Sequence, residues 1–223
     1  MTNTSVIGAG FEAGDGLRLG EFCVIGANVR FGANVTLGHH VVIEDDVVLG
    51  DNVKLGNHVV LKSGTRFGSH IDFADFCCTT GLSIVGNYVN VRTGAVVSKG
   101  VIVQDCAFIG PGVMTNHTKN VTHRRAHIAN DQYVTSIGYG SVVGSTVSMV
   151  AGLHMPPNVF IGAGAVVVKP ITEPGIYVGY PLKRLKDVPA SLALEVPDDF
   201  REHRFDPALV ERYLPAAMPN LLP

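Results

Sequence analysis

Side chains able to carry chemistry gather in one polar segment, Thr115–Ser136. This segment, TNHTKNVTHRRAHIANDQYVTS, contains His117, His123, Arg124, Arg125 and His127. An imidazole titrates near neutral pH and can take a proton from an attacking amine or hydroxyl, which is worth about 10²- to 10⁴-fold in rate. Guanidinium groups match phosphate oxygens in a bidentate arrangement. The segment is therefore a candidate site for proton transfer and anion binding.

His117 opens the segment and is the preferred candidate for a general base. Two other interpretations stay open, a surface loop histidine and a group that orients a substrate. His123 and His127 are alternative bases. Arg124 and Arg125, together with His123, are assigned to substrate binding through a nucleotide diphosphate, and the alternative is that the two arginines are solvated loop charges.

The scaffold that must position this segment is set by a period of six. From Ile7 to Ile109, every sixth residue is apolar for eighteen consecutive positions, and only Thr79 departs from the pattern. This period fits neither a helix nor a simple strand alternation, and it is typical of a hexapeptide-repeat β-helix. We therefore expect an all-β fold in which three short strands form each triangular coil and coils stack about 4.8 Å apart.

The fourth residue of each hexad predicts the corners of the coils. It is usually Gly, Asn, Asp or His, residue types that tolerate a left-handed backbone conformation. His40, His58 and His70 fall at such corners and are interpreted as structural. Cys23 and Cys77 fall at the fifth position and are interpreted as small buried thiols.

The register fails after Met114 and resumes at Ile137. The intervening residues, about 115–136, are predicted to leave the scaffold as one long loop, where function is common. The repeat continues to about residue 185, which gives a predicted domain 1–185. Residues 186–223 form a short proline-rich tail with two expected helical stretches, Asp199–His203 and Pro207–Tyr213, packed on the end of the coils or on a neighbouring subunit.

Composition limits the classes of partner. The formal charge is −2 with 16% charged residues and no basic block, which gives a nucleic-acid role little support. No apolar run is long enough to cross a membrane and the first residues do not resemble a signal peptide, so we expect no membrane partner and a cytoplasmic setting.

Several motifs resemble those of the left-handed β-helix acyltransferases over roughly residues 7–186. They are FIGPGVMTN (108–116), IGYGSVVGS (137–145), IGAGAVVVKPI (161–171) and GIYVGYPLKRLK (175–186). Among these enzymes the chain is most similar to N-acetyltransferases of nucleotide-linked amino sugars. The resemblance implies acetyl-CoA as acyl donor, no metal, a homotrimer, and active sites between adjacent subunits.

The resemblance also implies roles for particular residues. His117 would be the base, as in related acetyltransferases with a loop histidine, and Asn116 would hold the acceptor or the thioester oxygen, or simply begin the turn. Backbone groups at Gly144, Ser145, Gly162 and Ala163 would contact the pantetheine arm, unless these are ordinary repeat residues. Lys183, Arg184 and Lys169 are candidates for the coenzyme A phosphates, with solvated surface charge as the alternative.

Three departures from the family pattern leave the acceptor open. His117 replaces the acidic residue that usually follows Asn116, and no Tyr-Pro follows. Thr93-Gly94 replaces an asparagine pair, and Gln104 replaces a glutamate.

Two other functions stay open on the same fold. A γ-class carbonic anhydrase would need three histidines around zinc, and the spacing of His117, His123 and His127 does not match. A non-catalytic scaffold would not need the coenzyme A-like motifs.

Overall fold

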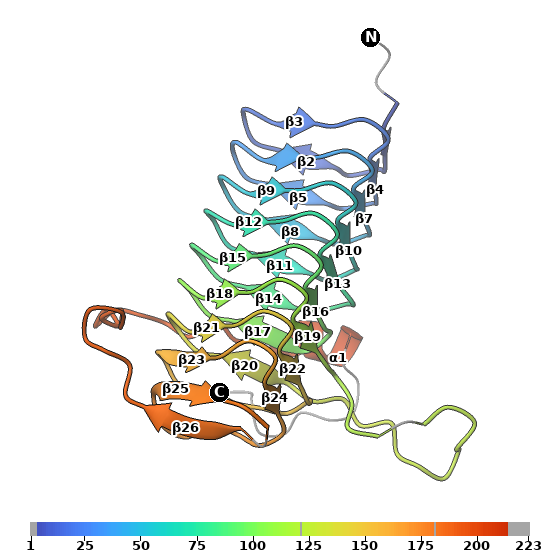
Figure 1. Ribbon diagram of the computed structural model, residues 1–223. Helices are drawn as coiled ribbons and strands as arrows, with labels where there is room; N and C mark the ends of the chain where they lie inside the picture. Colours follow the sequence, from blue (N-terminus) through green and yellow to red (C-terminus); the bar gives the residue numbers. More distant parts are fainter. Residues whose placement is uncertain (1–3, 121, 181, 214–223) are drawn as a thin grey trace.

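The computed structural model describes residues 4–120, 122–180 and 182–213 and contains a three-sided prism of stacked coils (Figure 1). Among the described strands, pairing is parallel from coil to coil, and only the last pair, β25 with β26, is antiparallel. The predicted left-handed parallel β-helix of hexapeptide repeats is confirmed. Val121, Pro181 and residues 214–223, which include the last three prolines of the predicted tail, lie outside the described residues.

Each side of the prism is one sheet. Sheet A contains β1 (Val6–Ile7), β4 (Val24–Ile25), β7 (Val42–Ile43), β10 (Val60–Leu61), β13 (Cys78–Thr79), β16 (Val96–Val97), β19 (Met114–Thr115), β22 (Ser148–Met149) and β24 (Val166–Val167). Sheet B contains β2 (Glu12–Ala13), β5 (Arg30–Phe31), β8 (Val48–Leu49), β11 (Arg66–Phe67), β14 (Ile84–Val85), β17 (Val101–Val103) and β20 (Thr135–Ile137). Sheet C contains β3 (Arg18–Leu19), β6 (Thr36–Leu37), β9 (Lys54–Leu55), β12 (Asp72–Phe73), β15 (Asn90–Val91), β18 (Phe108–Ile109), β21 (Val142–Val143), β23 (Val159–Ile161), β25 (Gly175–Val178) and β26 (Lys183–Lys186).

The six-residue period produces the core directly. The second residue of most strands points into the prism, and from Ile25 onward these side chains are almost completely buried. Cys23 and Cys77 are fully buried beside them, as predicted. Residues that pair between strands of successive coils are eighteen positions apart in the sequence, for example Val42 and Val60. Because every coil repeats the same register, apolar side chains stack into a continuous column.

The corners adopt the left-handed conformation that the fourth hexad position predicts. Asn28, Asn34 and Asn52 have φ between 55° and 57° there, and His40, His58 and His70 have φ between 56° and 60°. Phe22, Phe76 and Tyr88 share this conformation although bulky residues adopt it rarely. Their rings stack on the corner residues of neighbouring coils, and His40 lies 4.9 Å from His58 and 5.1 Å from Phe22 between ring centroids. Ring stacking of this kind can offset the backbone cost.

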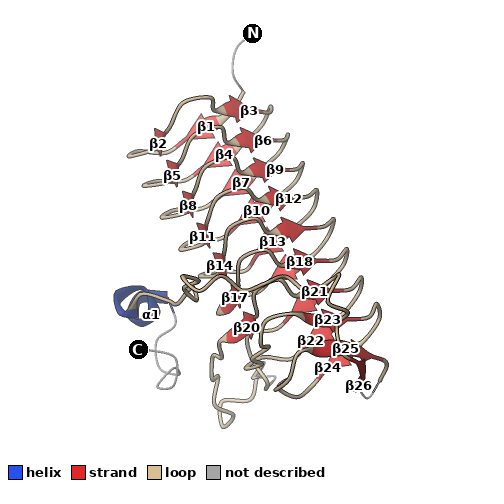
Figure 2. Ribbon diagram, turned by 90° about the vertical axis from the view of Figure 1, so that its left-hand side faces the viewer, coloured by secondary structure: helices blue, strands red, loops and turns tan. Residues whose placement is uncertain are grey.

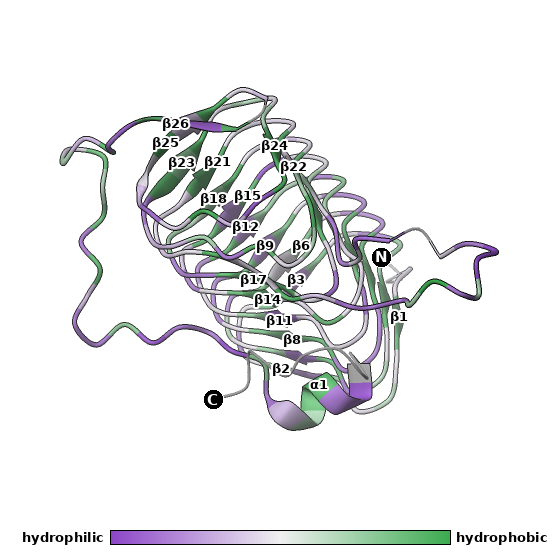
Figure 3. Cartoon of the chain, turned by 90° about the horizontal axis from the view of Figure 1, so that it is seen from below, coloured by the Kyte–Doolittle hydropathy of each residue, from purple (hydrophilic) through white to green (hydrophobic). Residues whose placement is uncertain are grey.

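The loop leaves the prism where predicted, at the corner between sheets A and B. The loop is slightly shorter than the predicted range 115–136, because Thr115 belongs to β19 and Thr135 and Ser136 belong to β20. Val103 pairs with Ile137, so the loop interrupts the chain without disturbing the stack. The loop and the start of the C-terminal tail project in different directions in two views (Figures 1 and 3).

One of the two helices predicted for the tail is present. The helix α1 (Pro207–Tyr213) is confirmed, but the helix predicted for Asp199–His203 is wrong, since Asp199 lies in a turn and residues 200–203 have no regular secondary structure. The Gln104 side chain accepts a hydrogen bond from His203 N and donates one to His203 O, which holds the backbone of His203 against the prism.

The tail also packs on the flank of its own prism rather than on the end of the coils. We call residues 187–213 the strap. It contacts progressively earlier coils, through Leu194 to Asn158, His203 to Asp105 and Arg212 to Asp46. Phe205 and Val210 are buried against Leu82, Ile102 and Val134, so α1 covers part of sheet B (Figure 2).

The three faces differ in their outward residues. Sheet A presents an apolar stripe along the whole prism, formed by Val6, Val24, Val42, Val60, Cys78, Val96, Met114 and Val166, with Ser148 as the polar exception. Sheet C presents Arg18, Thr36, Lys54, Asp72 and Asn90 before turning apolar at Phe108. Among the described helices, none has the length and apolar character needed to cross a membrane.

Glycines at the second hexad position are required by the stacking of coils, which a paired substitution tests. A Cβ at Gly56 would lie 2.5 Å from the backbone N of Asp75 in the next coil. We expect Gly56→Ala to lower the free energy of unfolding by roughly 1–3 kcal/mol, because the backbone must shift. The corner residue Gly94 has open space around its Cβ position, and Gly94→Asn should stay close to the parent. Equal melting temperatures of the two variants in calorimetry would contradict this explanation.

Candidate active site

At the corner between sheets A and B, the two legs of the loop contact each other at its base. Tyr133 N donates a hydrogen bond of 3.0 Å to His117 O, which joins the two legs of the loop. The Lys119 ammonium lies 4.4 Å from the centroid of the Tyr133 ring and adds a cation–π contact between the same legs. His117 is therefore held against the prism, although the rest of the loop projects outward.

His117 lies one coil beyond Lys99 in the register and is half-buried. Burial lowers the pKa of the His117 imidazole below its usual value, and the positive charge of Lys99 lowers it further. Both effects disfavour the imidazolium, because burial and a like charge penalise the charged form. The surroundings of His117 therefore favour the uncharged imidazole, which is the form able to accept a proton.

Asn116 uses part of its hydrogen-bonding capacity in contacts with the prism. Its side-chain Nδ2 donates a hydrogen bond of 2.9 Å to Met149 O, and its backbone N donates one of 3.1 Å to the same oxygen. The amide oxygen and one N–H remain available to a ligand by this count. Asn116 thus has the fixed position that a substrate-orienting group requires.

A groove of about 560 Å³ opens beside these residues. It is lined by Asn116, Thr118, Lys119, Asn120, Val150 and Val168. Its loop side is polar and its sheet side is apolar. The volume lies within the range of roughly 300–1,000 Å³ that small-molecule sites occupy.

The tip of the loop is separate from this groove in the single chain. His123, Arg124, Arg125 and His127 are exposed, and the tip is strongly hydrophilic (Figure 3). Arg125 donates a hydrogen bond of 2.9 Å to His123 O, and Arg124 turns the chain with a φ of 54°. Within the chain, His117 lies at the base of the loop and the two arginines lie at its tip.

The residues assigned to the pantetheine arm lie at another corner, between sheets C and A. Gly144 and Ser145 follow β21, and Gly162 and Ala163 follow β23. A Cβ at Gly144 would lie 2.6 Å from Ala163 N, so coil stacking alone requires a glycine there. These residues and His117 lie on opposite borders of sheet A.

The candidate phosphate-binding residues lie at the end of the prism. Lys169 follows β24 and lines a smaller pocket of about 290 Å³ with Tyr177 and Leu182. Lys183 and Arg184 are exposed on β26. Arg184 forms an ion pair with Asp187 and donates hydrogen bonds to Pro174 O. Part of its guanidinium is therefore already engaged in contacts next to the hairpin of β25 and β26.

Two further features were missed from the sequence. Ser136 Oγ and His154 Nδ1 form a hydrogen bond of 2.9 Å, and Gln104 binds the strap. The eighteen-residue register could have revealed the first, since Ser136 and His154 are separated by one coil. No comparable signal pairs Gln104 with His203.

Metal ligands are not assembled in the described part of the chain. Among residues 4–120, 122–180 and 182–213, no three His, Cys, Asp or Glu side chains form a group that could hold a metal ion. His117 lies at the base of the loop, whereas His123 and His127 lie at its tip.

Comparison with known proteins supports the same architecture. A family model described as bacterial transferase hexapeptide (six repeats) matches residues 32–63. No curated protein sequence matches the chain. A UDP-N-acetylglucosamine O-acyltransferase from Moraxella catarrhalis has a similar structure, with a TM-score of 0.71, 16% identity, and coverage of 82% of this chain and 72% of that one. The chain is a hexapeptide-repeat protein with a left-handed parallel β-helix. At this identity, the likeness shows the fold.

Two other solved structures are more distant from this hexapeptide-repeat protein. A polysialic acid O-acetyltransferase has a TM-score of 0.46 and 16% identity, with 93% of this chain and 98% of that one covered. A GDP-perosamine N-acetyl transferase from Caulobacter crescentus, solved with CoA and GDP-perosamine, has a TM-score of 0.41 and 20% identity. That match covers 66% of this chain, which spans 57% of the length of the perosamine enzyme.

The effect of Lys99 on His117 can be tested by substitution. In Lys99→Met, we expect the pKa of His117 to rise, because removing a nearby positive charge favours the imidazolium. An NMR titration of the imidazole carbons measures this directly. Lys54→Met removes an exposed charge from sheet C and serves as the control. An unchanged or lower pKa of His117 in Lys99→Met would contradict the described electrostatics.

Proposed function

We propose that this chain is an enzyme that transfers an acyl group from acyl-coenzyme A to an amine or hydroxyl of a sugar. Acetyl-CoA is the proposed donor, and a nucleotide-linked amino sugar is the proposed acceptor. The observation that carries the proposal is His117, whose lowered pKa favours the uncharged imidazole and whose chain neighbours Asn116 and Thr118 line a groove of small-molecule size. The fold shared with a UDP-N-acetylglucosamine O-acyltransferase supports it.

The proposed reaction needs one proton acceptor. The acceptor nitrogen or oxygen attacks the thioester carbonyl, and the neutral His117 imidazole takes the proton that it loses. The C–S bond then breaks, and the proton passes from His117 to the departing sulfur. Asn116 is proposed to orient the acceptor or the thioester oxygen through its remaining amide groups.

We further propose a homotrimer in which sheet A faces the threefold axis. The apolar stripe on sheet A is the kind of exposed surface that marks a protein interface. Sheet B is less suitable because the strap covers part of it. Ring-forming interfaces bring two different patches of neighbouring subunits together, so the corner with His117 on one protomer would meet the corner with Gly144 and Gly162 on the next.

This arrangement gives each assigned residue a role. The pantetheine arm would run along Gly144, Ser145, Gly162 and Ala163 of one subunit toward His117 of its neighbour. Lys169, Lys183 and the remaining donors of Arg184 would receive the coenzyme A phosphates. The exposed tip, with His123, Arg124 and Arg125, would contact the diphosphate of the acceptor, since guanidinium groups suit phosphate oxygens.

Replacement of His117 tests the catalytic proposal. We expect His117→Ala to lower turnover of acetyl-CoA with nucleotide-linked amino sugars by at least tenfold. Coenzyme A should still raise the melting temperature of this variant, because a ligand that binds only the folded state stabilises it. His127→Ala at the loop tip is the matched control. Turnover equal to that of the parent would remove His117 from the mechanism, and no melting shift with the parent protein would contradict coenzyme A as donor.

The pH dependence should follow the same histidine. Since the pKa of His117 is lowered, activity should be retained below the usual imidazole range and fall only at more acidic pH.

The assembly is tested by a charge on sheet A. We expect Val60→Glu to dissociate the oligomer into monomers, because a carboxylate would be buried at each interface without a partner. Asn90→Glu places the same charge on the polar part of sheet C and should leave the oligomer intact. Sedimentation velocity measures the state, and circular dichroism checks the fold. A trimeric Val60→Glu protein would exclude sheet A as the interface.

A further inference from the structure

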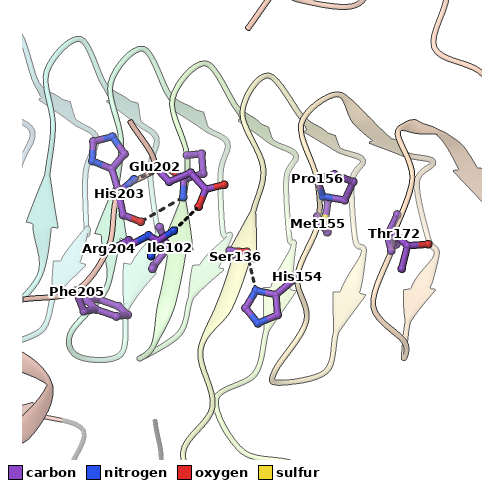
Figure 4. Close-up of a pocket in the computed structure, with 12 residues that line it drawn as sticks. Ile102, Ser136, His154, Met155, Pro156, Thr172, Glu202, His203, Arg204 and Phe205 are labelled. Atoms are coloured by element: carbon purple, nitrogen blue, oxygen red, sulfur yellow. Dashed lines mark hydrogen bonds and ion pairs between the residues drawn. The ribbon is translucent and has the colours of Figure 1, made fainter. Parts of the chain in front are cut away.

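A second pocket lies between the strap and the end of sheet B, and it shares no lining residue with the groove at the loop base. Its volume is about 390 Å³. Figure 4 shows Ser136 and His154 between Glu202–Phe205 of the strap on one side and Met155, Pro156 and Thr172 on the other. Four buried apolar side chains form part of its wall, namely Ile102, Met155, Ile171 and Phe205.

The pocket has a fixed polar pair. Ser136 and His154 form an isolated parallel bridge between adjacent coils, and Ser136 Oγ lies 2.9 Å from His154 Nδ1. If the hydroxyl donates, His154 Nε2 carries the proton and is a donor to a ligand. If Nδ1 donates instead, Nε2 is an acceptor. The pair can therefore match a ligand hydroxyl in either direction.

The charges at the pocket are balanced. Arg204 in the strap lies 3.6 Å from Glu202, and both side chains are largely exposed. His203 is bound to Asp105 at 2.5 Å. A phosphate or carboxylate ligand would meet a carboxylate beside Arg204 and beside His203, whereas a neutral ligand with both donors and acceptors could use the exposed pair of Arg204 and Glu202.

From these features we infer that the pocket binds a neutral pyranose sugar. The hydroxyls of a sugar both donate and accept, which suits Ser136, His154, Glu202 and Arg204. The C–H faces of the ring suit the apolar wall that Ile102 and Phe205 contribute. Such a mixture of apolar lining and a few placed polar groups is typical of small-molecule sites.

The pocket is formed before any ligand arrives. Gln104 holds the backbone of His203 on both sides, and Phe205 is anchored in the small core of Leu82 and Ile102. The wall formed by the strap therefore does not need to be ordered on binding, which reduces the entropy cost of association.

This inference is independent of the proposed acyl transfer, and a binding experiment separates the two. The probes are methyl glucopyranoside and N-acetylglucosamine as neutral pyranosides, with inorganic phosphate and coenzyme A as the charged alternatives. NMR signals of the His154 imidazole report on the pocket, and signals of His117 report on the groove. We expect saturable shifts of His154 with at least one neutral pyranoside and none with phosphate.

Two variants test the polar pair. Ser136→Ala and His154→Gln should each weaken binding of the pyranoside at least tenfold, as measured by ligand-observed NMR. Ser148→Ala on sheet A is the matched control and should bind like the parent. If either pocket variant loses its fold, Arg204→Ala at the exposed rim replaces it with the same expectation. Binding of phosphate alone, no pyranoside binding, or full affinity in the folded variants would each overturn the inference. A shift of His117 with coenzyme A bears only on the proposed acyl transfer.

Discussion

The structure depends on one constraint, the stacking of each coil on the previous one at an offset of eighteen residues. Inward apolar side chains need this register to form one column, and glycines such as Gly56 and Gly144 are required because the next backbone comes so close. Left-handed corners return the chain to the same register after every strand. A rigid prism of this kind can hold a few side chains at fixed separations, which a binding or catalytic site needs.

The candidate sites lie where the chain departs from that register. The loop leaves the corner between sheets A and B, and its closed base fixes His117 beside Lys99. The strap returns along sheet B and is held by Gln104, Asp105 and Asp46. It covers one face and encloses a pocket, while sheet A keeps its apolar stripe. The same scaffold thus presents a groove, a second pocket and a surface suited to assembly.

The sequence predicted the repeating part of this molecule because the period, the corner residues and the break after Met114 are local signals. It failed for Asp199–His203, which form no helix, because the backbone of His203 pairs with the side chain of Gln104, a residue about one hundred positions earlier in the chain. The pairing of Ser136 with His154 was accessible in principle through the coil register. The distance between His117 and the loop-tip arginines could not be predicted, because no repeat governs the path of the loop.

We propose that His117 of one subunit serves a donor site on the next, and mixing of subunits tests this proposal most directly. His117→Ala lacks the base, and Ala163→Arg should block the donor corner, so each homotrimer should be inactive. Trimers assembled from an equal mixture of the two variants should recover about a quarter of the parent activity, since that fraction of interfaces pairs two intact halves. A mixture that forms mixed trimers but remains inactive would contradict the shared site.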